Sequence, residues 1–145
     1  MPVVQFSYAD VPSISLPNKA SVKRFIQSLF EAEGISLKYL SYVFCSDEFL
    51  LQINQDHLQH DYYTDIITFD LSAKKLGPIT GEIYISTERV KENATTHGFT
   101  FKKELLRVML HGALHLCDYK DKTKREITLM RDKEDHYLRL FEEQI

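Results

Sequence analysis

The segment at 101–117, FKKELLRVMLHGALHLC, restricts the fold of this 145-residue chain more than any other feature, because it is apolar on most sides after its first turn. A surface helix keeps one polar face, whereas a helix that is apolar all round is buried. The segment therefore predicts a central helix enclosed by the rest of the chain. Two histidines, His111 and His115, interrupt its apolar surface. Burial of an imidazole is costly unless its nitrogens find partners, so both histidines need an explanation.

The spacing of apolar residues and the positions of turn residues predict the other elements. We expect four strands, at 3–8, 37–45, 65–71 and 82–86. We expect helices at 19–33, 46–54 and 87–97, and Gly34 and Gly98 as the stops after the first and third of them. This order predicts an α+β fold in one domain over 1–145, with a mixed sheet of about four strands packed on helices and the central helix among them.

The last helix is expected to begin after Thr123, which forms a capping-box pattern with Glu126. Its apolar residues fall at helical spacing, which predicts one inward face. The residues expected on that face are Ile127, Met130, Tyr137, Leu138 and Phe141.

Composition and the N-terminal sequence restrict the class of protein. Hydrophobic residues make up 43% of the chain, as is typical of a soluble globular protein. No apolar run approaches the roughly 20 residues of a membrane span, and the start of the chain lacks the pattern of a secretory signal. The two cysteines, Cys45 and Cys117, are too few for a disulfide framework. We therefore expect a cytoplasmic protein with reduced thiols and no membrane partner.

Positive charge is concentrated in one part of the chain. Residues 101–125 carry seven basic and three acidic side chains, which makes this segment +4 although the whole chain is −3. A local positive potential can attract phosphates whatever the overall charge. A solvated helix end and loop has the same composition, and charge alone favours that simpler interpretation.

The two histidines point to a metal. Residues four apart on a helix share a face, so His111 and His115 can reach one ion, and a turn after the helix can bring Asp121 to the same ion. Two histidines and a carboxylate, with an open position for water, are typical of catalytic zinc. We expect one Zn²⁺ per chain, with Mn²⁺ or another divalent ion as the alternative, because a carboxylate suits harder ions. A zinc peptidase would place Glu after the first histidine, and Gly112 stands there instead.

Three ordered motifs resemble those of the YbeY family of metal-dependent single-strand endoribonucleases. HGALHLCDYKD at 111–121 is similar to the family's H-G-x-L-H-L-x-G-Y-D-H. NQDHLQHDYYTDIITF at 54–69 is similar to N-x-x-Y-R-x-x-D-x-x-T-D-V-L-S-F, and GEIYIS at 81–86 is similar to G-D-I-x-I. The resemblance implies hydrolysis of phosphodiesters in single-stranded RNA, tied to maturation of ribosomal RNA (16S 3′-end processing) and to ribosome quality control. It implies ribosomal RNA or the small ribosomal subunit as partner.

The chain departs from the family motifs at four positions. Asp121 stands where the family has its third metal-ligating histidine, Asp118 stands for the second glycine, and Lys120 for an aspartate. Aspartate tolerates the left-handed conformation that such a turn requires. Leu58 stands where the family has an arginine that is a candidate for holding the substrate phosphate.

Either other side chains bind the substrate phosphate, or the activity is weakened. The candidates are His57, His60 and the basic residues of 120–125, Lys122 and Lys124 among them. Thr64 and Asp65 are further candidates, since the resemblance places their segment along the cleft. No side chain stands out as general base.

Two other functions stay open on the sequence alone. One is a ribosome-assembly or RNA-binding factor with a structural or vestigial metal, which Leu58 favours. The other is a small metallohydrolase that acts on another substrate, although Gly112 counts against peptide hydrolysis. Oligomeric state and protein partners do not follow from the sequence.

Overall fold

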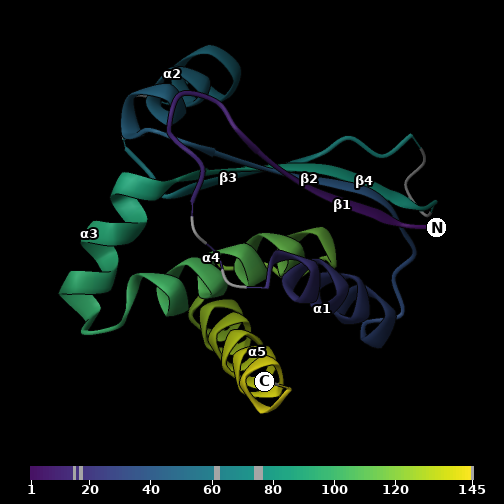
Figure 1. Ribbon diagram of the computed structural model, residues 1–145. Coiled ribbons are helices and arrows are strands. Elements are labelled where there is room, and N and C mark those ends of the chain that lie inside the picture. The colour runs from purple at the N-terminus through teal and green to yellow at the C-terminus, as the bar shows by residue number, and fades with distance from the viewer. Residues whose placement is uncertain (15, 17, 61–62, 74–76, 145) are drawn as a thin grey trace.

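A computed structural model describes residues 1–14, 16, 18–60, 63–73 and 77–144 (Figure 1). Strands and helices follow one another in this order: β1 Val3–Tyr8, α1 Lys19–Ala32, β2 Leu37–Cys45, α2 Asp47–Leu58, β3 Ile66–Asp70, β4 Ile79–Ser86, α3 Thr87–His97, α4 Phe101–Leu116 and α5 Lys124–Glu143. The expected α+β fold and its mixed four-stranded sheet are confirmed. None of the described helices is long and apolar enough to cross a membrane.

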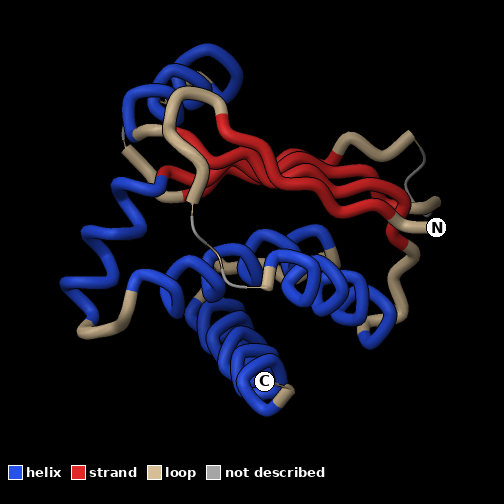
Figure 2. The backbone as a smooth tube through the Cα atoms, in the orientation of Figure 1, coloured by secondary structure: helices blue, strands red, loops and turns tan. Residues whose placement is uncertain are grey.

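The sheet has the strand order β1-β2-β4-β3. β1 and β4 lie parallel to β2, and β3 lies antiparallel to β4 at the edge. Figure 2 shows α1 and α4 against one face of the sheet, with α5 on the far side of α4, and α2 at one end of the opposite face. The buried side chains of α4 thus lie between the sheet and two helices, as its sequence predicts.

Close packing of α4 on the sheet depends on Gly112. A Cβ atom at this position would lie 2.8 Å from Ile83 Cδ1 and 3.0 Å from Ile66 Cδ1. The buried hydroxyl of Tyr42 donates a hydrogen bond to the backbone oxygen of Met109 at 2.8 Å, which fixes α4 over β2. The position after the first histidine is therefore used for packing and leaves no room for a catalytic glutamate.

Most expected element ends are close to the observed ones, with two differences. α2 continues to Leu58 instead of ending at 54, and β4 begins at Ile79 instead of 82. The capping box of Thr123 and Glu126 at the start of α5 is confirmed. The turn expected before β4 lies partly outside the described residues.

The prediction for the inward face of α5 is wrong at one residue. Met130, Tyr137, Leu138 and Phe141 are buried, but Ile127 is 51% exposed. Ile127 lies in the first turn of α5, where the helix borders a cleft instead of the core. Both cysteines are free and buried, Cys117 as the expected core residue.

Candidate metal centre

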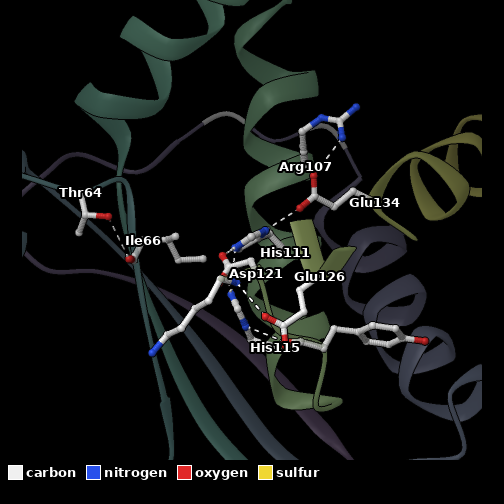
Figure 3. Close-up of polar contacts among 10 residues, drawn as sticks. Thr64, Ile66, Arg107, His111, His115, Asp121, Glu126 and Glu134 are labelled. Atoms are coloured by element: carbon white, nitrogen blue, oxygen red, sulfur yellow. Dashed lines mark hydrogen bonds and ion pairs between the residues drawn. The ribbon is translucent and has the colours of Figure 1, made fainter. Parts of the chain in front are cut away.

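His111, His115 and Asp121 lie together at the C-terminal half of α4 (Figure 3). The two Nε2 atoms are 3.0 Å apart, and each lies 3.2 Å from Asp121 Oδ2. Around tetrahedral zinc, with bonds of about 2.0–2.1 Å, two ligand atoms lie about 3.3 Å apart. The three atoms therefore form a triangle close in size to one face of a zinc tetrahedron, which leaves the fourth corner for water or substrate.

The opposite nitrogen of each histidine is held by a hydrogen-bond acceptor. His115 Nδ1 donates to the backbone oxygen of Tyr119 at 2.9 Å, and His111 Nδ1 donates to Glu134 Oε2 at 2.5 Å. A ring whose Nδ1 carries the hydrogen has its lone pair on Nε2. Two lone pairs and a carboxylate oxygen then face one another, an arrangement that repels itself unless a cation lies among them. The residues present fit a divalent ion.

Glu134 is the contact that sequence analysis missed. It comes from α5, is only 5% exposed, and also accepts a hydrogen bond from Arg107 at 3.0 Å. Burial opposes the charged form of His111, but the hydrogen bond and charge of Glu134, with the charges of Asp121 and Asp65, hold the pKa of His111 above its ordinary value. The available signal was a carboxylate on the inward face of α5, where a charge needs a buried partner.

The turn that carries Asp121 is fixed at two points. Asp118 takes the expected left-handed conformation, with φ of 74°, and Tyr119 N donates to Leu114 O at 3.1 Å. The Tyr119 hydroxyl donates to Glu33 Oε1 at 2.6 Å, which ties the turn to the end of α1. Tyr137 also donates to Glu33.

Glu33 is a second residue that sequence analysis missed. Burial alone would raise its pKa, but the hydrogen bonds of Tyr119 and Tyr137 and the charge of Lys133 outweigh that effect and hold it below the usual value. Its partners lie 86 and 104 residues away along the chain. No local pattern marks such a contact.

Two clefts meet at the triad. The first, here the α3–α5 cleft, has a volume of about 310 Å³, and the second, the α2–β3 cleft, about 480 Å³. Both are lined by the same four residues: Asp65, Ile66, His111 and Asp121. The α3–α5 cleft also has Asn93, His97, Arg107, Ile127, Met130 and Arg131. The α2–β3 cleft also has Asn54, Leu58, His60, Thr64, Thr68 and Asp70.

The structure brings some of the expected substrate-side residues to the triad and leaves others away from it. Thr64, Asp65 and His60 line the α2–β3 cleft beside the triad. His57 instead lies against Phe69, with ring centroids 6.3 Å apart, in a hollow away from the triad. His57 lies on α2, whereas His60 lies beyond the end of this helix at Leu58, after Gln59 has turned the chain in a left-handed conformation with φ of 55°.

The two lysines expected to bind substrate lie outside both clefts. Lys122 and Lys124 are exposed on the turn and at the start of α5, and Lys124 lines a separate hollow with Arg125. Leu58 does line the α2–β3 cleft and is 39% exposed, so an apolar side chain stands where the family arginine would lie.

Asp65 is a carboxylate beside the triad that does not belong to it. It lines both clefts and is partly buried at the start of β3, and this burial raises its pKa. A raised pKa makes a carboxylate a better proton acceptor.

The family model described as Endoribonuclease YbeY matches residues 10–142. The chain belongs to the YbeY family. A relative from Cytophaga hutchinsonii named Endoribonuclease YbeY is 49% identical over 93% of this chain and 94% of the relative. One from Flavobacterium psychrophilum with the same name is 44% identical over 96% of each chain. The solution structure of a Thermotoga maritima protein matches this fold with a TM-score of 0.61 and 25% identity, over 96% of this chain and 89% of that one.

Proposed function

We propose that this protein is a metal-dependent endoribonuclease that hydrolyses single-stranded RNA and acts on ribosomal RNA during its maturation. The observation that carries the proposal is the His111, His115 and Asp121 triad at the junction of two clefts in a chain of the YbeY family. We expect the whole chain, 1–145, to act as one domain, with one Zn²⁺ or, as the alternative, Mn²⁺.

Each residue of the site has a separate task. His111, His115 and Asp121 would hold the ion, and Glu134 and the Tyr119 carbonyl keep the Nε2 lone pairs directed at it. A bound divalent ion polarises a phosphoryl oxygen and lowers the pKa of a coordinated water to near neutrality. Because Nδ1 of both rings is occupied, neither histidine can turn away without breaking a hydrogen bond.

We assign Asp65 as the general base that accepts the proton of the attacking water. It borders the triad from β3 and is free of metal-binding duty, and its raised pKa suits a general base. Thr64, its neighbour, donates to Ile66 O at 3.5 Å, which supports the turn into β3 (Figure 3). We keep Thr64 and His60 as residues that line the path of the strand in the α2–β3 cleft.

A ribosome-assembly factor that binds RNA without cutting it is the second candidate, and Leu58 in the α2–β3 cleft is the observation that favours it. That cleft carries three carboxylates, Asp65, Asp70 and Asp121, and no arginine or lysine among its described lining residues. Binding of a phosphate there depends largely on the metal ion.

The test separates cutting from binding. Protein stripped with a chelator and reloaded with Zn²⁺ or Mn²⁺ is incubated with end-labelled single-stranded RNA and with the same sequence in a duplex. We expect internal cleavage of the single strand alone, only with metal, and loss of cleavage in Asp65→Asn with the metal still bound. Retained RNA binding with no metal-dependent cleavage would favour the assembly factor.

A further inference from the structure

We propose that the α3–α5 cleft is a nucleotide subsite beside the scissile phosphate, and that Arg131 binds a phosphate of the RNA strand there. This inference rests on the proposed function and names where the strand is held. His111 and Asp121 of the triad line this cleft, so a group inside it would lie next to the ion.

Arg131 is the cation that is available in this cleft. Arg107 is occupied by Glu134 at 3.0 Å and by Asp135 at 2.7 Å, and His97 lies 3.6 Å from Glu104. Arg131 lines the cleft and is exposed, and its guanidinium has neither a hydrogen bond nor an ion pair within the described part of the chain. A guanidinium with open donors binds phosphate in a fixed, two-pronged geometry.

The position of arginine in the two clefts explains why the phosphate would be held on this side. The α3–α5 cleft carries four carboxylates: Glu134 is paired with Arg107, Glu104 lies by His97, and Asp65 and Asp121 lie at the triad. Arg131 is the arginine of this cleft that has no ion pair within the described residues. The α2–β3 cleft has Leu58 at its rim and lacks an arginine or lysine among its described lining residues. The cation missing from one cleft is thus supplied in the other.

The apolar wall of the cleft suits a nucleobase of the RNA strand. Ile127 lies one turn before Arg131 on the same side of α5 and is 51% exposed, which is costly for a large apolar side chain in water. Ile66 and Met130 continue this wall, and Asn93 of α3 adds an amide at its edge. A volume of about 310 Å³ is at the lower end for small-ligand sites. A base that enters it must be unpaired, which is a physical reason for cutting single strands.

The experiment compares Arg131→Ala, Arg131→Lys and the control Arg139→Ala, which removes the same charge from an exposed position farther along α5. Cleavage kinetics are measured on the metal-loaded enzyme with end-labelled single-stranded RNA. Affinity is measured by fluorescence anisotropy at several salt concentrations, with metal removed so that the strand stays intact. We expect Arg131→Ala to raise KM and Kd about tenfold with kcat little changed, and to reduce the salt slope by about 0.7, the share of one phosphate contact on a single strand. Arg131→Lys should restore part of the affinity.

A second comparison tests whether the cleft binds an RNA nucleobase. Replacing one nucleotide next to the cleavage position by an abasic residue should weaken binding to the wild type, and should matter much less to Ile127→Ser, which has already lost the apolar wall. The double variant Lys122→Glu, Lys124→Glu tests the alternative that the RNA strand binds along the basic turn instead. If that double variant weakens binding and Arg131→Ala matches Arg139→Ala while the wild type still cuts RNA, the subsite is wrong and the proposed function stands. If the wild type cuts no RNA, the proposed function fails, and the affinity measurements still decide whether Arg131 contacts the strand.

Discussion

The two parts of the metal centre are held in different ways. His111 and His115 stand on α4, a helix packed between the sheet and two other helices, and their relative position follows from helical geometry. Asp121 stands on a short turn that is partly exposed and held by the left-handed Asp118 and the contact between Tyr119 and Glu33. The helix is rigid through its own burial, whereas the turn depends on single hydrogen bonds from distant parts of the chain.

The two parts of the site therefore differ in how much variation they allow. A helix with two histidines tolerates little variation, because its other side chains form the core. A turn outside the core can exchange one side chain for another, and Asp121 stands on this turn where the motif that the chain resembles has a histidine.

Loss of either helix ligand should have the largest effect. We expect His111→Ala and His115→Ala each to reduce bound zinc below half of one ion per chain, because two ligands rarely hold zinc against buffer. Alanine is the best helix former, so the fold should survive. Plasma emission on protein purified without chelator measures the metal, and His136→Ala, an exposed histidine on α5, is the control. Full zinc in both variants would show that the site has been assigned to the wrong residues.

Substitution of the turn ligand should have a graded effect. Asp121→Asn removes the charge at nearly constant size, and we expect zinc affinity to fall about tenfold to a hundredfold. Asp121→His restores the family's three histidines and should preserve or tighten binding. Competition with a chromophoric chelator compares the two variants with the wild type. Three equal affinities would mean that Asp121 is not a ligand.

Glu134→Gln tests the hydrogen bond that holds His111 on α4. It leaves the ligands in place but removes the charge that accepts the hydrogen of His111, so we expect about a tenfold loss of zinc affinity. The same chelator titration measures the change, and Glu143→Gln, exposed at the end of α5, provides a matched loss of charge. An affinity equal to that of the control would limit Glu134 to a packing role.

Glu33→Gln tests the contact that holds the turn with Asp121. It should lower the free energy of unfolding more than it changes metal affinity. Hydrogen bonds to a charged group contribute about 1.5–3 kcal/mol, and we expect a loss near the lower end at neutral pH, in the metal-free protein. The pKa of Glu33 is below its usual value of 4.5 in the folded state. Its contribution is therefore present above pH 4.5 and is lost as the pH falls through the lower, folded pKa.

The free energies of unfolding of wild type and Glu33→Gln should thus converge in acid. Urea unfolding at a series of pH values measures both. A constant difference between the two proteins down to the lowest pH at which they fold would mean that the charge of Glu33 contributes nothing.

Several features follow from the sequence because they are local. The i, i+4 spacing of His111 and His115 on an apolar helix predicts both the burial of α4 and a shared ligand direction. Thr123 and Glu126 lie within one helical turn, so the start of α5 can be read from them. The family motifs add the position of the third ligand, which spacing alone leaves open.

Other features were decided only by tertiary structure, since they depend on residues far apart in the chain. Ile127 shares helical spacing with Met130 and both line the α3–α5 cleft, yet only the packing of α3, α4 and α5 shows that Ile127 is half exposed and Met130 is buried. Glu134 reaches His111 across 23 residues, and Glu33 reaches Tyr119 across 86. Periodicity assigns a residue to a face of its own element, but it does not say what that face meets. The sequence therefore predicted the two candidate ligands of α4, and the packing of α1 and α5 around them determined how these side chains are held.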